Sequence, residues 1–457
     1  MLTDPANRKT ALLTATLSSF LIPFMASSVN IALPSIGREL KINAVLLSWV
    51  ATSYLLSTAV FLVPFGKIAD IYGRKKILVY GTGVYTVSSL LLAVSPSALL
   101  LISFRIVQGI GAAMIFGTAM AILTSVYPLA ERGKALGINV TATYLGYSLG
   151  PFLGGFLTYH LGWRSIFLAS VPLGILIVSL ILFKLKGEWA EAAGEKVDLT
   201  GAMIYGLTLI AIIYGFSLLP GIRGAWLIFM GFVGIVAFVK WEMRVESPVL
   251  SLNLFRNNRP FTFSNLAALI NYSATFAVAF LLSLYLQYIK GINAKDAGFI
   301  LVSQPFVQAI VSPFAGRLSD RIEPRIVSSI GMAVTVVGML FFVFINEKTT
   351  LAVIIIGLVL LGIGLALFSS PNINAVMSSV EKKFYGLASA TLGTMRMIGQ
   401  TFSMATMTLI FAITIGRVQI TPEYYPLFMK GVRVAFLIFI ILSFGAIFAS
   451  LARGKLR

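Results

Sequence analysis

The chain has 457 residues, of which 58% are hydrophobic and only 11% are charged. A soluble protein would carry roughly a quarter charged residues, so this composition excludes an ordinary soluble domain and indicates an integral membrane protein. The absence of cysteine excludes disulfides and thiolate metal sites. The net charge of +19 would suggest nucleic acid in a soluble protein, but in a membrane protein it has a topological explanation and predicts no nucleic-acid partner.

Apolar runs long enough to span a bilayer, roughly 20 residues each, recur along the whole chain. They are too continuous for the alternating strands of an outer-membrane barrel, so we expect an all-α fold with fourteen transmembrane helices. The expected helices cover residues 11–34, 46–66, 77–95, 98–126, 134–160, 165–184, 201–219, 225–243, 260–288, 296–316, 326–345, 350–378, 386–413 and 431–452. The first run has no obvious cleavage site, and we expect it to be retained as a span rather than removed as a signal peptide.

The lysines and arginines of the expected loops predict the orientation. If the N-terminus is inside, the inside segments carry more than twice as many of these residues as the outside segments. Positive charge concentrates on the cytoplasmic side of membrane proteins. We therefore expect a multi-pass protein of the cell membrane with both termini in the cytoplasm.

Sequence similarity within the chain indicates an internal repeat. The segment 66–76 is partly repeated at 316–325, and Gly109-Ile-Gly111 is repeated at Gly362-Ile-Gly364. These offsets predict two six-helix bundles related in parallel, with two helices inserted between them. Parallel repeats place the substrate path between the halves near the bilayer midplane. The predicted divisions are an N-terminal bundle at 1–185, a linker at 186–200, two inserted helices at 201–243, a second linker at 244–259 and a C-terminal bundle at 260–457.

The segment 66–76 places Asp70 between Gly66 and Gly73, and Arg74 follows the second glycine beside further cations. The pattern resembles the motif in the loop between the second and third helices of the major facilitator superfamily. Charge-assisted hydrogen bonds at a helix end can act as a latch that holds a gate in one state. The alternative is an ordinary positively charged loop. The partial copy retains Asp320 but has Glu323 in place of the second glycine.

Small residues follow one another at helical spacing in the fifth expected helix: Gly146, Gly150, Pro151, Gly154 and Gly155. This string resembles the antiporter signature of the same superfamily, and the resemblance implies export rather than uptake. Glycines four residues apart also let a neighbouring helix approach closely, so a plain packing face is the alternative.

Three further segments resemble the fourteen-helix drug/proton antiporter branch of the superfamily. They are the sixth-helix opening at 163–174, the segment 198–201 and the segment 248–261. The resemblance extends over essentially the whole chain. It implies a cationic drug as the substrate and a proton as the counter-ion.

Two arginines, Arg105 and Arg396, fall inside expected helices. A charge within a membrane span is costly and indicates function by default, so we expect these residues to act in coupling or in contact with substrate charge. The resemblance supports Arg105 as a participant in proton coupling or anion contact. The alternative for each is a structural arginine that is bonded to backbone carbonyls.

The acidic residues depart from the branch. Met25 stands where the branch has an aspartate in its first helix, and every one of the sixteen Asp and Glu residues falls in a loop or at an expected helix end. A buried carboxylate could attract a cationic drug and carry a proton, and no such residue is available here. Proton coupling would have to use a gate carboxylate such as Asp70 or Glu131, or a proton on the substrate.

The expected lining of the cavity is neutral and polar, although polar groups in spans also serve simply to bond helices together. The candidates are Met25, Ser27, Asn30, Tyr54, Tyr144, Tyr147, Asn271, Gln304 and Asn372.

The sequence thus predicts a secondary active exporter of amphipathic small molecules, of the multidrug-efflux type, that works by alternating access and exchanges protons. The alternative is an exporter or flippase-like carrier of anionic or lipid-like amphiphiles without proton coupling. No nucleotide-binding loop is present, so we expect no direct use of ATP, no cofactor and no metal. We expect a monomer in the lipid bilayer, not an enzyme; a channel would need a filter-like loop that the sequence lacks.

Overall fold

The computed structural model describes residues 5–245, 248–250, 254–256, 258–381 and 384–454, and this part is helical without strands. The first eight helices are α1 (Pro5–Glu39), α2 (Ala44–Tyr72), α3 (Arg74–Ala93), α4 (Ala98–Val126), α5 (Leu129–Leu161), α6 (Arg164–Phe183), α7 (Leu199–Leu218) and α8 (Ile222–Glu242). The remainder are α9 (Arg259–Thr275), α10 (Ala277–Leu284), η2 (Tyr285–Ile289), α11 (Ala294–Leu301), α12 (Ser303–Arg321), α13 (Pro324–Val343), α14 (Leu351–Ser378), α15 (Tyr385–Thr414), η4 (Pro422–Tyr424) and α16 (Tyr425–Ala452).

Thirteen helical segments in the described residues are long and apolar enough to cross a membrane. The remaining long helix, α5, has 33 residues and a lower hydropathy because glycine, threonine and tyrosine are frequent in it. Together they confirm the all-α membrane fold. Two expected spans are each made of more than one helical element. Helices α9, α10 and η2 together form one span, and α11 and α12 together form another.

Several helices extend beyond the expected bounds. Helix α1 begins at Pro5 rather than residue 11, and α2 continues to Tyr72 rather than residue 66. Hydropathy detects only the apolar middle of a span, whereas the backbone hydrogen bonds of a helix continue into its polar ends. The latch segment therefore lies partly on α2 and partly at the start of α3.

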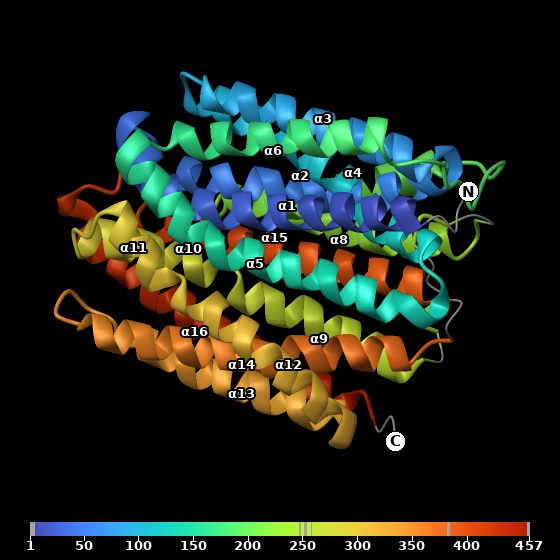
Figure 1. Cartoon of the computed structure of the whole chain (residues 1–457). Helices are drawn as coiled ribbons and strands as arrows, with labels where there is room; N and C mark the ends of the chain where they lie inside the picture. The colour runs from blue at the N-terminus through green and yellow to red at the C-terminus, as the bar shows by residue number, and fades with distance from the viewer. Residues whose placement is uncertain (1–4, 246–247, 251–253, 257, 382–383, 455–457) are drawn as a thin grey trace.

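The helices form two bundles with the same internal packing (Figure 1). In the first, α1 packs on α5, α2 on α4, and α3 on both α4 and α6. In the second, α9 packs on α15, α12 on α14, and α13 on both α14 and α16. The corresponding pairs show that the two six-helix bundles are parallel repeats of one another.

The inserted helices α7 and α8 pack on each other at the seam between the bundles. Helix α7 contacts α2 of the first bundle and α15 of the second. The Tyr205 hydroxyl donates to the Ala59 carbonyl at 3.0 Å, which ties α7 to α2. The residue boundaries of the domains and linkers stay a prediction, and the linker 244–259 lies partly outside the described residues.

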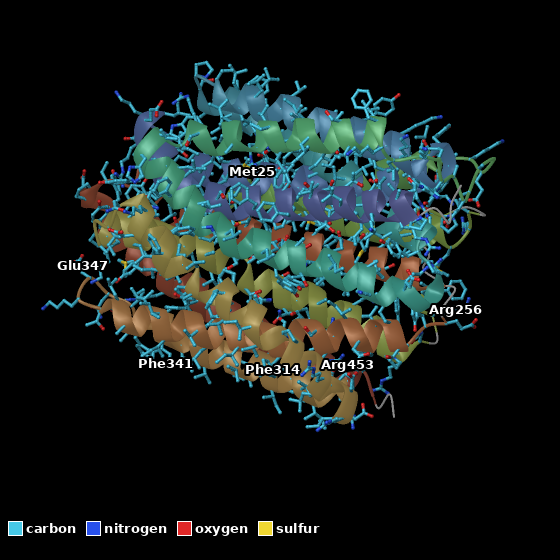
Figure 2. All side chains as sticks on the ribbon, viewed as in Figure 1. Met25, Arg256, Phe314, Phe341, Glu347 and Arg453 are labelled. Atoms are coloured by element: carbon cyan, nitrogen blue, oxygen red, sulfur yellow. The ribbon has the colours of Figure 1, made fainter. Side chains whose placement is uncertain are left out.

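Both chain termini lie at the same end of the molecule (Figure 1), which we call the terminal face; the opposite end is the far face. Figure 2 shows Phe314 and Phe341 at the outside of the second bundle, where their side chains are exposed. Lipid would contact such residues in a membrane protein. Met25 lies inside the first bundle and is fully buried among apolar side chains.

Candidate functional site

Three glycines of the predicted antiporter string pack α5 against α1. A Cβ atom on Gly146 would lie 2.5 Å from the Phe20 carbonyl oxygen, and one on Gly154 would lie 2.7 Å from the Ser28 Cα. At Gly150 the Ser28 hydroxyl donates to the backbone carbonyl at 2.9 Å. Close backbone approach of this kind requires glycine, so these positions hold the first bundle together.

The other two residues of the string face the second bundle. A Cβ on Gly155 would collide with the Ala294 carbonyl oxygen, and one on Gly298 would collide with the Pro151 carbonyl oxygen. Helices α5 and α11 therefore cross in direct backbone contact. The string thus serves two interfaces, one within a bundle and one between bundles.

Polar contacts between the bundles gather toward the far face. They are Ser283 Oγ to the Asn30 carbonyl at 2.7 Å, Gln287 Nε2 to the Ile31 carbonyl at 2.9 Å, Ser48 Oγ with Thr408 Oγ1 at 2.8 Å, and Ala44 N to the Val418 carbonyl at 2.9 Å. Nearer the middle of the molecule, Tyr144 Oη bonds Ser369 Oγ at 3.2 Å and Gln400 Nε2 donates to Tyr147 Oη at 3.5 Å. Toward the terminal face, Ser389 Oγ donates to Met120 Sδ at 3.2 Å. The far face is therefore the closed one.

Arg105 is held inside the first bundle. Its Nε donates to the Val50 carbonyl at 3.0 Å, one terminal nitrogen donates to Gln108 Oε1 at 2.5 Å, and its Cζ lies 4.1 Å from the Tyr54 ring centroid. The Gln108 amide in turn donates to Ser89 at 2.8 Å. With 1% of its surface exposed, Arg105 ties α2, α3 and α4 together.

Arg396 occupies a different setting, between the bundles. It is half-buried, and its Cζ lies 5.0 Å from the Tyr272 ring centroid and 5.4 Å from that of Tyr147. One helical turn further along α15, Gln400 Nε2 donates to the Tyr147 hydroxyl at 3.5 Å. Tyr147 belongs to α5, so this group of side chains includes residues of both bundles.

The remaining cavity candidates divide by location. The Tyr144 hydroxyl bonds Ser369 across the seam at 3.2 Å, and Gln304 is half-buried on α12. Asn271 is fully buried, and neither atom of its amide has a partner among the described residues. The others are occupied in helix packing: Ser27 donates to the Pro23 carbonyl, Asn30 accepts from Ser283 through its backbone, Tyr54 lies under Arg105, and Asn372 donates to the Ser264 carbonyl.

The predicted latch lies at the terminal face, and its centre is Arg74. Its guanidinium bonds Asp70 at 2.7 Å and Ser125 at 2.5 Å, and it takes the Glu191 carboxylate in two hydrogen bonds of 2.7 and 3.0 Å. Gly73 has a φ of +118° at the junction of α2 and α3. That backbone conformation favours glycine, and a Cβ there would also strike the Glu188 side chain.

The linker after α6 supplies three carboxylates to this corner, which we call the acidic clasp: Glu188, Glu191 and Glu195. Glu188 accepts from the backbone N–H groups of Lys75 and Lys76 at the start of α3, at 2.7 and 3.2 Å, where the helix dipole favours an anion. Glu195 pairs with Lys67 at 2.6 Å. These residues were not predicted from the sequence. The signal that could have indicated them is three acidic residues, at spacing three and four, in a linker that can reach a basic loop.

The other predicted gate residues make fewer and longer polar contacts than Arg74 does. Glu131 pairs with Arg8 at 3.5 Å, and 55% of its side chain is exposed. Asp320, in the partial copy of the latch, accepts from Asn374 Nδ2 at 3.3 Å. Gly66 has open space where a Cβ would project.

Another buried arginine, Arg453, lies in the second bundle near the C-terminus. It is fully buried and donates to Ser450, Ser264 and Asn372 at 2.5 to 3.3 Å. Hydropathy could not reveal it, because hydropathy does not show that a residue just past a span folds back into the bundle. All three nitrogens of its guanidinium thus donate within the second bundle.

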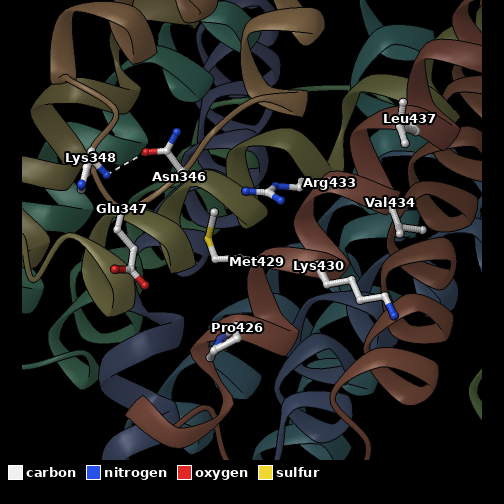
Figure 3. A pocket seen from close by; sticks show the side chains of 9 residues that line it. All are labelled: Asn346, Glu347, Lys348, Pro426, Met429, Lys430, Arg433, Val434 and Leu437. Carbon is white, nitrogen blue, oxygen red and sulfur yellow. Dashed lines mark hydrogen bonds between the residues drawn. The ribbon is translucent and has the colours of Figure 1, made fainter.

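Two hollows lie on the far face. The first, of about 650 Å³, is shown in Figure 3 and is lined by Asn346, Glu347, Lys348, Pro426, Met429, Lys430, Arg433, Val434 and Leu437. The second, of about 550 Å³, lies over the closed seam, with Arg38 of α1, Tyr159 of α5 and Asn293 before α11 in its walls. Neither is lined by a sequence-predicted site residue.

The model of the major facilitator superfamily matches residues 15–261 and 264–455. The chain belongs to the major facilitator superfamily. It is accordingly a multi-pass membrane transporter of small molecules.

Relatives within the superfamily carry names of transport and export proteins. The cephamycin export protein of Amycolatopsis lactamdurans is 32% identical over 87% of this chain and 83% of its own length. The riboflavin transporter RibZ of Clostridioides difficile is 29% identical over 82% of each chain. The multidrug resistance protein Stp of Mycobacterium tuberculosis is 31% identical over 85% of this chain and 73% of its own.

A solved structure has the same superfamily fold. The bacterial homologue of the human lysosomal transporter Spinster, in an inward-facing and unoccupied conformation, superimposes with a TM-score of 0.72. It covers 98% of both chains at 16% sequence identity. This likeness concerns the fold alone.

Proposed function

We propose that this transporter is a secondary active exporter of amphipathic small molecules that works by alternating access. The observation that carries the proposal is the pair of repeated bundles closed against each other on one face only. A carrier of this kind exposes one site to the two sides of the membrane in turn. Relatives named as export proteins for a cephamycin and for tetracenomycin C, and one named as a multidrug resistance protein, support the direction of transport.

The orientation of the proposal follows the positive charge of the loops. We propose that the terminal face is cytoplasmic, in agreement with the excess of lysine and arginine in the segments that reach it. The closed far face is then the outer one. In this state the site would load from the cytoplasm, which is the side from which an exporter takes its substrate.

The leading form of the proposal couples export to protons through a carboxylate at the terminal face. Asp70 and Glu131 are the candidates, and each has a cationic partner in this state, Arg74 and Arg8 respectively. A carboxylate that loses its partner when the bundles rock would gain a proton more easily. Such a cycle would link protonation to gate movement.

A second candidate function is export of anionic amphiphiles, or of lipid-like ones, without proton coupling. It is favoured by the placement of charge: the acidic residues in the described part of the chain lie in loops or near helix ends, whereas Arg396 lies between the bundles. A membrane potential that is negative inside already favours the exit of an anion, by about 2.3 kcal/mol per charge at 100 mV. Such a substrate needs no proton to drive it.

One experiment separates the two functions. The purified transporter is placed in liposomes that contain a pH-sensitive dye and is challenged with ethidium, a cation, and then with 2-naphthoate, an anion. Proton movement that depends on ethidium and is abolished by Glu131→Gln or Asp70→Asn supports proton-coupled export. Naphthoate flux that follows the membrane potential without proton movement supports the second function, and RibZ makes riboflavin a useful neutral third probe.

We further propose that the transporter works as a monomer. The side chains around Arg396 come from both bundles of one chain, so a single copy supplies both halves of the site. Dilution of the reconstituted protein to one copy per vesicle should leave the transport rate per molecule unchanged.

A further inference from the structure

Three arginines that lie within the helix bundles, Arg105, Arg396 and Arg453, differ in what their nitrogens contact. Arg105 and Arg453 are almost completely buried and direct donors to oxygens of their own bundle. Arg396 is only half-buried, and among the described residues its Nε has no hydrogen-bond partner and no ion pair includes it. The protein itself supplies acceptors for the guanidinium groups of Arg105 and Arg453. The guanidinium of Arg396 still has a donor that a ligand could use.

Arg396 lies deep in the membrane. It follows Tyr385, the first residue of α15, by eleven positions and precedes Thr414, the last one, by eighteen. At 1.5 Å per residue it is roughly 16 Å from the near end of the helix. A guanidinium keeps its charge under all conditions found in proteins, so this charge must be stabilised by its surroundings.

The surroundings of Arg396 are aromatic rather than acidic. Tyr147 and Tyr272 offer their ring faces from α5 and α9, and cation–π contact of this kind stabilises a guanidinium only in part. Gln400 adds a buried amide oxygen, Oε1, without a partner among the described residues. The group therefore combines one permanent cation, ring faces for stacking and polar atoms for orientation.

We propose that Arg396 is the anion-binding residue of the transport site, and that the ligand it favours is an aromatic molecule with one carboxylate or sulfonate group. The inference rests on the proposed export function and specifies its substrate class. A guanidinium binds such oxyanions with two parallel hydrogen bonds, and the tyrosine rings supply faces for the aromatic part. Because Tyr147 and Arg396 belong to different bundles, the ligand contacts both halves that move.

Arg105 is excluded from this role by its contacts. Its Nε and one terminal nitrogen are occupied by Val50 and Gln108, and a tyrosine ring covers its plane. It also lies only seven residues after Ala98, at the far-face end of α4. The site accordingly has one anion-binding arginine, not two.

The test is equilibrium binding to the full chain in lipid nanodiscs, with no gradient present. The probes are 2-naphthoate, the isosteric neutral 2-naphthamide and a naphthyl trimethylammonium cation. The wild-type protein should bind naphthoate at least tenfold more tightly than naphthamide, and the cation most weakly. Arg396→Gln should remove the preference for naphthoate over naphthamide, and Arg396→Lys should restore part of it.

The matched control is Arg433→Gln, which removes an arginine on the exposed far side of α16 and should leave all three affinities unchanged. A wild-type protein that binds the cation or naphthamide as well as naphthoate would overturn the inference, and this measurement needs no variant to fold. Equal weakening of naphthoate and naphthamide binding by Arg396→Gln would also overturn it. Normal naphthoate binding without any flux in liposomes would instead refute the proposed export function and leave the anion site standing.

Discussion

The guanidinium of Arg74 and the carboxylate of Glu191 form two parallel hydrogen bonds, of 2.7 and 3.0 Å, between the start of α3 and the linker after α6. The same guanidinium bonds Asp70 on the last turn of α2. One arginine therefore joins two helices of the first bundle to the segment that leads toward the second. The latch expected from the sequence therefore has three parts: Asp70 on α2, Arg74 on α3 and the acidic clasp in the linker after α6.

Loss of either carboxylate that pairs with Arg74 should affect transport more than folding. Glu191→Gln and Asp70→Asn each remove one charge and keep the shape of the side chain, and exposed ion pairs contribute only about 1 kcal/mol or less to stability. We expect the free energy of unfolding to fall by about that much and the transport rate to fall about tenfold. Normal transport at normal expression in both variants would show that Arg74 has no gating role.

The pH dependence of the clasp follows from Glu191. Burial by itself raises the pKa of this carboxyl, but the hydrogen bond and charge of Arg74, aided by Ser125 and by the charge of Arg132, outweigh burial and hold the pKa below its usual value. A lowered pKa in the folded state gives stability that is present above the unfolded pKa and is lost as the pH falls through the folded value.

Between about pH 6 and pH 8, therefore, Glu191 should stay ionised, and the clasp should contribute a constant stability. Glu191 is then not the proton carrier of a coupled cycle. If the transport rate changes with pH in this range, the profile should be the same shape in Glu191→Gln. A pH profile that flattens in this variant would contradict the account.

The packing of α5 on α1 can be tested with two alanine substitutions on one helix. Gly146→Ala places a methyl group against the Phe20 carbonyl oxygen, whereas Gly137 has no neighbour within 4 Å of the added carbon. Overpacking of this kind costs typically about 1–3 kcal/mol. We expect a lower unfolding temperature for Gly146→Ala alone, by light-scattering or fluorescence melts; equal melting of both variants would refute the role of the glycine.

The far-face closure should respond to Gly298. A methyl group there collides with the Pro151 carbonyl of the other bundle, so Gly298→Ala should push the bundles apart on that face. Because the chain has no cysteine, Ser48→Cys provides a single reporter in the closed seam. A membrane-impermeant maleimide added from the far face should label it several-fold faster in the Gly298→Ala background, and an unchanged rate would contradict the closure.

The two arginines of the spans should behave differently when removed. Arg105→Gln leaves the Val50 carbonyl and Gln108 without their donor in a buried place, and loss of one partner of a buried charged contact costs about 1–3 kcal/mol. We therefore expect Arg105→Gln to lower thermal stability and Arg396→Gln to leave it nearly unchanged. The opposite order would show that Arg396 is the structural residue.

The sequence predicted the spans well because apolar length alone determines them, and it predicted the repeat because the latch residues near Asp70 recur near Asp320. It could not separate Arg105 from Arg396, because their difference lies in contacts with residues far away in the chain, Val50 for one and Tyr147 for the other. Nor could hydropathy reveal the acidic clasp. Its carboxylates contact Lys67 and Arg74, which lie more than a hundred residues earlier in the chain. Polar candidates such as Asn372 were chosen by residue type, and the structure shows this one bonded to Arg453.

Alternating access itself is tested most directly by counterflow. Liposomes that contain the transporter are preloaded with unlabelled ethidium, 2-naphthoate or 2-naphthamide and diluted into a trace of the same compound in labelled form, with no ion gradient. The account predicts that at least one probe shows transient, saturable accumulation of label above equilibrium, and that Asp70→Asn slows this accumulation about tenfold. Simple equilibration of all three probes without overshoot, or unsaturable flux of the kind a channel gives, would contradict it.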